Sequence, residues 1–247
     1  MKNLIQKIKT WFRKRGSKKR PVLYCIHGFG VRRTVEFDPL KAYFEAKGHE
    51  VVTVSLFDQT QDTDNDPQMW IQRAKAGLEP LIAQKRQVWL VGFSMGGVIA
   101  SQLASEYPIQ RLVLLAPAFE YLTLQTVKNV AEGAVRSLLN KPKPISTAYP
   151  PLPDSFASTF RSVVALCKES ITNVKQPVLF LHGSADEVIP VRSSENAYTK
   201  VNHDQKLLLI IENVQHRILD DETQQNDVLY LIDEFFNGKI VKAKDHQ

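Results

Sequence analysis

A serine lies at the centre of a glycine-rich pattern, Gly92-Phe93-Ser94-Met95-Gly96, which follows a strand-like apolar run and opens a helix-like one. Glycines two positions before and after the serine let strand and helix backbones approach without Cβ clashes. A serine at such a strained turn projects its hydroxyl above the sheet, and the helix N-terminus offers N–H groups to developing negative charge. The pattern predicts that Ser94 is a nucleophile; the alternative is a glycine-rich turn with a bystander serine.

A serine hydroxyl is a weak nucleophile, so it needs a base, and the base needs an acid that orients it. Asp186 follows the apolar run 178–181, and His216 follows the apolar run 207–211, the last one with strand character. Two other carboxylates compete for the role of the acid: Glu187 is adjacent to Asp186, and Glu120 follows another predicted strand. The residues therefore predict a Ser, acid, His arrangement in that chain order.

The remaining histidines and the cysteines receive no chemical role. His27 and His182 each precede a glycine at a strand end, and we expect them to form structural hydrogen bonds. Three histidines in polar stretches are expected to be solvated: His49, His203 and His246. Cys25 lies in an apolar run, and with Cys167 it forms neither a disulfide framework nor metal-ligand spacing. The sequence thus predicts neither a metal site nor a cofactor.

Short apolar runs alternate with longer amphipathic ones along the chain, which is typical of βαβ units around a mostly parallel sheet. The expected strands are Val22–Ile26, Val51–Leu56, Val88–Val91, Leu112–Leu115, Val178–Leu181 and Leu207–Ile211. The expected helices are Pro39–Ala46, Pro67–Ala83, Met95–Ser105, Ser193–Lys200 and Glu222–Phe236. The alternation lapses over residues 119–175, where prolines interrupt apolar helical segments, so we expect an insertion between two strands there.

Four features together resemble α/β-hydrolases of the bacterial carboxylesterase and monoacylglycerol lipase type: the Ser94 pattern, the loop His27-Gly28-Phe29-Gly30, the turn 183–190 and His216. The resemblance extends over residues 21–237. It implies an α/β-hydrolase fold, with a mostly parallel central sheet flanked by helices and a small cap insertion at about residues 119–175.

The resemblance also implies roles for individual residues. The length of the turn and its closing Pro190 favour Asp186 as the acid. In this family the loop after the first strand and the residue after the nucleophile donate backbone N–H groups to the oxyanion, which in this sequence are Phe29 and Met95. The sequence departs from the family at Gln215, because such enzymes usually have glycine before the catalytic histidine.

These observations favour a serine hydrolase that cleaves carboxylic esters of small molecules, either a carboxylesterase or an acylglycerol lipase, without cofactor or metal. A thioesterase or amidase would use the same triad. A non-catalytic hydrolase-fold protein that binds a ligand is the alternative from a different class. Apolar residues of the insertion, among them Phe156 and Phe160, fit either an acyl pocket or the insertion's own core.

The positive charge is concentrated at the N-terminus. Residues 1–20 contain nine of the 32 Lys and Arg and no acid, so residues 21–247 hold 23 basic against 26 acidic groups. This distribution argues against a nucleic-acid groove on a hydrolase domain spanning 21–247. The pattern of segment 1–20 predicts a basic amphipathic helix, which would either contact a membrane surface or pack against protein. The alternative is a disordered tail. Apolar runs are too short to cross a bilayer, and we expect a cytoplasmic protein.

Overall fold

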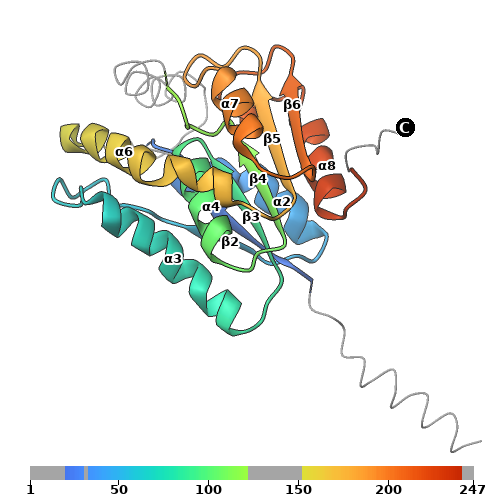
Figure 1. The fold of residues 1–247 in the computed structure, drawn as a ribbon, viewed down its shortest axis with the longest axis horizontal. Helices are drawn as coiled ribbons and strands as arrows, with labels where there is room; N and C mark the ends of the chain where they lie inside the picture. The colour runs from blue at the N-terminus through green and yellow to red at the C-terminus, as the bar shows by residue number, and fades with distance from the viewer. Residues whose placement is uncertain (1–19, 31–32, 122–151, 241–247) are drawn as a thin grey trace, which may run out of the picture.

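The computed structural model describes residues 20–30, 33–121 and 152–240 (Figure 1). Within these residues a six-stranded sheet has the order β2-β1-β3-β4-β5-β6, and every neighbouring pair is parallel. Its strands are β1 Val22–Ile26, β2 Val51–Val54, β3 Val88–Phe93, β4 Arg111–Leu115, β5 Val178–Gly183 and β6 Lys206–Ile211. The predicted parallel sheet is confirmed.

Helices cover both faces of this sheet, as Figure 1 shows. On one face, α3, α4 and α6 pack against side chains such as Leu90, and on the other, α2 and α8 pack against side chains such as Val91. Adjacent residues of a strand point to opposite faces, so a strand that is buried on both sides reads as a continuous apolar run. The helices are α2 Asp38–Ala46, α3 Pro67–Ala83, α4 Met95–Glu106, α6 Asp154–Cys167, α7 Arg192–Lys200 and α8 Gln225–Phe236. Short 3-10 segments are η1 Arg33–Phe37, η2 Lys168–Asn173 and η3 Ile218–Asp220.

The winding of the chain reverses between β1 and β3. After β1 the chain adds β2 on one side, and it then returns to add β3 on the other side of β1. Ligands of open α/β sheets bind at the carboxyl ends of the strands at such a reversal. Ser94 directly follows β3, and His27 directly follows β1, so the topology brings these two motifs together.

Several element boundaries differ from the sequence expectation by one to three residues. Strand β2 ends at Val54 rather than Leu56, because the Leu56 N–H leaves the ladder and donates to His27 Nε2 at 2.9 Å. Helix α8 begins at Gln225 rather than at Glu222. None of the helices that the structure describes is long and apolar enough to pass through a membrane.

The predicted insertion is partly described. Helix α6 and η2 lie between β4 and β5, whereas residues 122–151 lie outside the described residues, as does the predicted amphipathic helix up to residue 19. Phe156 and Phe160 of α6 are fully buried, with ring centroids 5.0 Å from Trp70 and 5.2 Å from Phe29, respectively. These two phenylalanines therefore belong to the core of the domain.

The expectation that three histidines are solvated is wrong for two of them, and His246 lies outside the described residues. His49 is buried, its ring lies 4.9 Å from that of Trp89, and its Nδ1 lies 2.9 Å from the Pro21 carbonyl oxygen. His203 is half-buried, with both ring nitrogens shielded from solvent. Polar neighbours in sequence do not prevent an imidazole from covering an aromatic ring when one nitrogen bonds a carbonyl.

Candidate active site

Ser94 forms the turn between β3 and α4. Its backbone has φ 52° and ψ −119°, a conformation that is costly for a residue with a side chain. The turn is held by its N–H, which donates to the Leu115 carbonyl at 2.9 Å, and by its carbonyl, which accepts from Gly97 and Ala118 at 3.0 Å each. Surrounding backbone therefore maintains the strained geometry that the sequence pattern predicts.

Two glycines make this turn sterically possible. A Cβ on Gly92 would lie 2.5 Å from the Gly96 carbonyl oxygen, and a Cβ on Gly96 would overlap the carbonyl of Ile26. Helix α4 can therefore begin directly against the ends of β1 and β3. This contact places Ser94 beside the loop that follows β1.

Asp186 and His216 meet from two separate loops. His216 Nδ1 lies 2.8 Å from Asp186 Oδ2, and the other carboxylate oxygen accepts the N–H groups of Val188 and Ile189 at 2.8 Å each. The side chain of His216 is 8% exposed and that of Asp186 is fully buried. With Nδ1–H donating to the carboxylate, Nε2 of a neutral His216 is left as the proton acceptor.

Gly183 allows these two loops to approach each other. A Cβ at this position would overlap the carbonyl of Val214 and would lie 2.9 Å from that of Gln215. The glycine at the end of β5 thus makes room for the backbone that precedes His216. The departure from the family pattern at Gln215 leaves the hydrogen bond between His216 and Asp186 in place.

A second histidine contacts the same carboxylate. His182, fully buried, places Nε2 3.1 Å from Asp186 Oδ2, while its Nδ1 lies 2.7 Å from Ser194 Oγ. Burial raises the pKa of Asp186, but hydrogen bonds from His182, His216 and the Ile189 N–H outweigh burial and hold that pKa well below its usual range. Asp186 is therefore ionised at neutral pH.

The two competing carboxylates are bonded elsewhere. Glu187 accepts the backbone N–H of His216 at 3.2 Å, whereas the imidazole contacts Asp186. Glu120 contacts Arg192 Nε at 3.2 Å and Asn196 Nδ2 at 2.6 Å, on the exposed side of α7. In this geometry only Asp186, among the three candidates, contacts the His216 ring.

The structure brings His216 close to the serine turn without a direct hydrogen bond. The ring of Phe93, the residue before Ser94, lies 4.9 Å from the His216 ring. The Ser94 side chain makes no hydrogen bond that caps α4, and the serine is 6% exposed. Catalytic hydrogen bonds are often long before substrate binds, so this geometry is compatible with a nucleophile and its base.

His27 orients the loop after β1. Its Nε2 accepts the Leu56 N–H at 2.9 Å, so Nδ1 carries the proton and donates to the Gly28 carbonyl at 2.7 Å. The C=O and N–H of a trans peptide point in opposite directions, so the N–H of Phe29 points away from His27. A Cβ on Gly28 would lie 3.1 Å from Ser94 Cβ, which shows that this loop lies against the serine.

Met95, the other predicted oxyanion donor, is the first residue of α4. The first N–H groups of a helix have no partner within the helix, and they attract negative charge. The donors expected from the sequence thus come from the loop after β1 and the start of α4. Among the residues that the structure describes, no group of three or more His, Cys, Asp or Glu side chains could hold a metal ion.

A family model described as the alpha/beta hydrolase family matches residues 23–193, which is more than half of the chain. This chain belongs to the alpha/beta hydrolase family. It is 30% identical to human monoacylglycerol lipase ABHD6 over 197 residues, which cover 74% of this chain and 52% of the relative. This hydrolase therefore spans about half the length of the curated relatives it matches.

Solved structures share the fold of this alpha/beta hydrolase. A monoacylglycerol lipase from Paleococcus ferrophilus superposes with a TM-score of 0.69 at 16% identity, covering 91% of this chain and 97% of the other. A meta-cleavage product hydrolase from Pseudomonas fluorescens IP01 superposes with a TM-score of 0.65 at 18% identity, covering 90% of this chain and 92% of the other. At such identities the likeness shows the fold alone, so the bond that is cleaved must be argued from the site.

Sequence reasoning missed two features of this hydrolase. It assigned His182 a structural hydrogen bond without naming its partners, which are Ser194 Oγ, the Ile189 carbonyl and the Asp186 carboxylate. The spacing of four residues within one turn was the available signal. It also gave no role to Glu36 and Arg217, which are far apart in sequence and close in space.

Proposed function

We propose that this alpha/beta hydrolase cleaves carboxylic esters with Ser94 as nucleophile, His216 as base and Asp186 as the orienting acid. The observation that carries the proposal is the 2.8 Å contact between His216 Nδ1 and Asp186 Oδ2 beside the strained Ser94 turn. A base oriented by a buried carboxylate next to such a serine is the arrangement that activates a hydroxyl nucleophile.

The reaction follows from the protonation states. Ser94 Oγ attacks the carbonyl carbon and its proton passes to His216 Nε2, while ionised Asp186 stabilises the imidazolium. The tetrahedral intermediate then expels the alcohol, which takes that proton, and the acyl group remains on Ser94. Water, deprotonated by His216, attacks the acyl-enzyme, and the released serine recovers the proton.

The former carbonyl oxygen carries the negative charge of the tetrahedral intermediate, and this oxyanion needs hydrogen-bond donors. We assign this role to the N–H groups of Phe29 and Met95, each worth roughly 3 kcal/mol of barrier. The His27–Gly28 hydrogen bond at 2.7 Å supports the assignment of Phe29, because it aims the next N–H away from His27.

The substrate class rests on the relatives. Several are monoacylglycerol lipases, so we propose a monoacylglycerol or a similar ester of a small alcohol. Helix α6 of the insertion packs against the sheet, so the cap over the acyl group would come from other residues of the insertion at about 119–175. The basic segment 1–20 would give peripheral contact with a membrane that holds such a substrate.

A substrate panel tests the proposal. Purified protein is incubated with p-nitrophenyl esters of increasing chain length, a monoacylglycerol and an acyl-CoA, and Ser94→Ala is the matched control. We expect ester turnover that falls by several orders of magnitude in Ser94→Ala. Preferential cleavage of acyl-CoA would make the protein a thioesterase instead. Equal turnover by both proteins would exclude Ser94 as nucleophile.

A further inference from the structure

A buried carboxylate links the two loops of the proposed active site. Glu36 lies in η1, its side chain is 7% exposed, and its Oε2 accepts the Gly28 N–H at 3.2 Å. A Cβ on Gly30 would lie 3.8 Å from Glu36 Oε1. The carboxylate therefore bonds the residue before Phe29 and lies near the residue after it, and Phe29 is the residue to which we assign an oxyanion donor.

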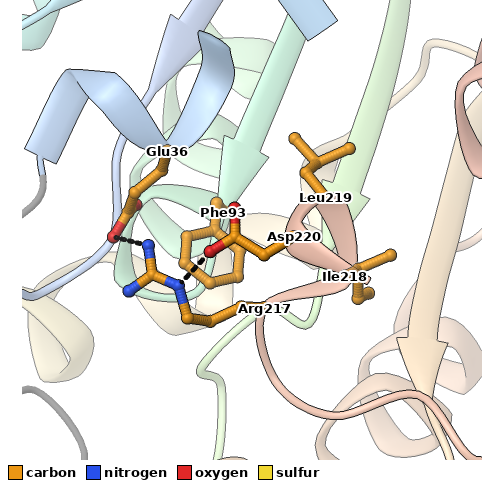
Figure 2. Close-up of a pocket in the computed structure, with 6 residues that line it drawn as sticks. All are labelled: Glu36, Phe93, Arg217, Ile218, Leu219 and Asp220. Carbon is orange, nitrogen blue, oxygen red and sulfur yellow. Dashed lines mark hydrogen bonds and ion pairs between the residues drawn. The ribbon is translucent and has the colours of Figure 1, made fainter. Parts of the chain in front are cut away.

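The same carboxylate faces the residue after the proposed base. Arg217 Nη2 lies 3.8 Å from Glu36 Oε1, and Arg217 Nε donates to Asp220 Oδ2 at 2.7 Å. Figure 2 shows the guanidinium between the two carboxylates. The cavity that these side chains line measures about 10 Å³, roughly the room for one water molecule, so it does not hold a substrate group.

We propose that Glu36 is a positioning residue that fixes the oxyanion loop relative to the His216 loop, through the Gly28 N–H on one side and Arg217 on the other. The inference rests on the proposed function, because it assumes that Phe29 N–H binds an oxyanion. A buried negative charge one residue from that donor opposes the developing oxyanion, and Arg217 offsets it. Arg217 thus places positive charge beside the carboxylate that holds the loop.

The negative charge of Glu36 and its hydrogen bond with the Gly28 N–H can be removed separately by mutation. Glu36→Ala removes both, so kcat should fall about 10- to 100-fold while KM changes less than about threefold, because a displaced donor acts mainly on the transition state. Glu36→Gln keeps an acceptor for the Gly28 N–H and should stay within about fivefold of wild type. Arg217→Ala removes a cation beside the buried Glu36 carboxylate and should lower kcat, and adding Glu36→Gln should restore most of that loss.

A merely structural role predicts a different pattern. The kcat of the double variant would then be no higher than that of Arg217→Ala, and across the variants kcat would fall in proportion to the loss in melting temperature. Glu234→Ala on α8, which breaks the 2.7 Å ion pair with Lys239 beyond the helix, is the matched control and should leave kcat unchanged. The proposal is overturned if Glu36→Ala keeps kcat within twofold of wild type, or if the double variant shows no recovery.

Labelling of Ser94 by a fluorophosphonate separates this proposal from the choice of substrate. If wild type is labelled but cleaves no ester of the panel, the substrate assignment fails, and labelling rates of the Glu36 variants still decide the positioning role. We expect slower labelling of Glu36→Ala than of Glu36→Gln. If wild type is neither labelled nor active, the proposed function and this inference fall together.

Discussion

Nε2 of His182 lies 3.1 Å from Oδ2 of Asp186, the oxygen that also contacts His216 Nδ1 at 2.8 Å. One carboxylate oxygen is thus shared by two imidazoles, one fully buried and one at the edge of the proposed active site. His182 is itself held by Ser194 Oγ at 2.7 Å. Ser194 of α7 therefore helps to orient the Asp186 carboxylate, because it holds His182, which contacts that carboxylate.

Replacement of His182 should loosen Asp186. Loss of a hydrogen bond to a buried charge costs about 1.5–3 kcal/mol, so His182→Ala should reduce the free energy of unfolding by about 2 kcal/mol. It should also lower kcat by about tenfold, because His216 loses a fixed partner. His182→Gln offers a replacement N–H and should recover part of both losses. Urea unfolding and ester kinetics measure the two effects, and unchanged values in His182→Ala would contradict the prediction.

The lowered pKa of Asp186 predicts a pH dependence of stability. A carboxyl with a depressed native pKa binds fewer protons in the folded state than in the unfolded state, so its contribution is present above the unfolded pKa, about 3.9. That contribution is lost as pH falls through the native pKa. Calorimetry from pH 6 down to pH 3 should therefore show a steeper fall in melting temperature for wild type than for Asp186→Asn. Parallel curves would mean that Asp186 is not the group responsible.

Glycine should relieve the strain at Ser94. A residue with a side chain at positive φ costs about 1–3 kcal/mol, and glycine removes that cost in the native state. Both Ser94→Ala and Ser94→Gly should be inactive, but Ser94→Gly should be the more stable of the two by about 1 kcal/mol. Glycine's extra freedom in the unfolded chain limits the gain. Thermal unfolding decides, and a less stable glycine variant would show that the turn is not strained.

The three candidate acids should rank by their contact with the imidazole. Asp186→Asn should lower kcat on the order of 10³- to 10⁴-fold, because an amide favours the wrong imidazole tautomer. Glu187→Gln keeps an acceptor for the His216 N–H and should cost less than about tenfold, and Glu120→Gln should cost less still. Matched ester kinetics on all three provide the comparison. A larger loss for Glu187→Gln would transfer the role to that residue.

The basic segment 1–20 should act apart from the chemistry. Deletion of residues 1–18 should leave turnover of a soluble ester nearly unchanged and weaken sedimentation with anionic vesicles. Binding by the intact protein should fall as salt rises, because surface attraction is screened over about 10 Å at 0.1 M. Trp11→Ala should also weaken binding at constant charge. A deletion that lowers the melting temperature by several degrees, without any vesicle binding, would instead indicate packing against the domain.

The sequence by itself determined the local features of this protein. Strands buried on both faces are continuous apolar runs, so β1 and β3 could be located from residue type alone. The turn at Ser94 could be predicted because its glycines are needed within two residues of the serine. Such features depend on neighbours in the chain, and the sequence displays those neighbours directly.

Only the tertiary structure decided which distant side chains meet. Asp186, Glu187 and Glu120 are all carboxylates, and the sequence favours Asp186 only through its resemblance to a family. The contact with His216 selects Asp186 directly, because β5 and β6 are adjacent in the sheet. The polar neighbours of His49 predict a solvated ring, whereas the ring lies against Trp89. Glu36 and Arg217 follow different strands, and their pairing requires the folded sheet. No periodicity encodes such contacts, because strand order and loop packing set them.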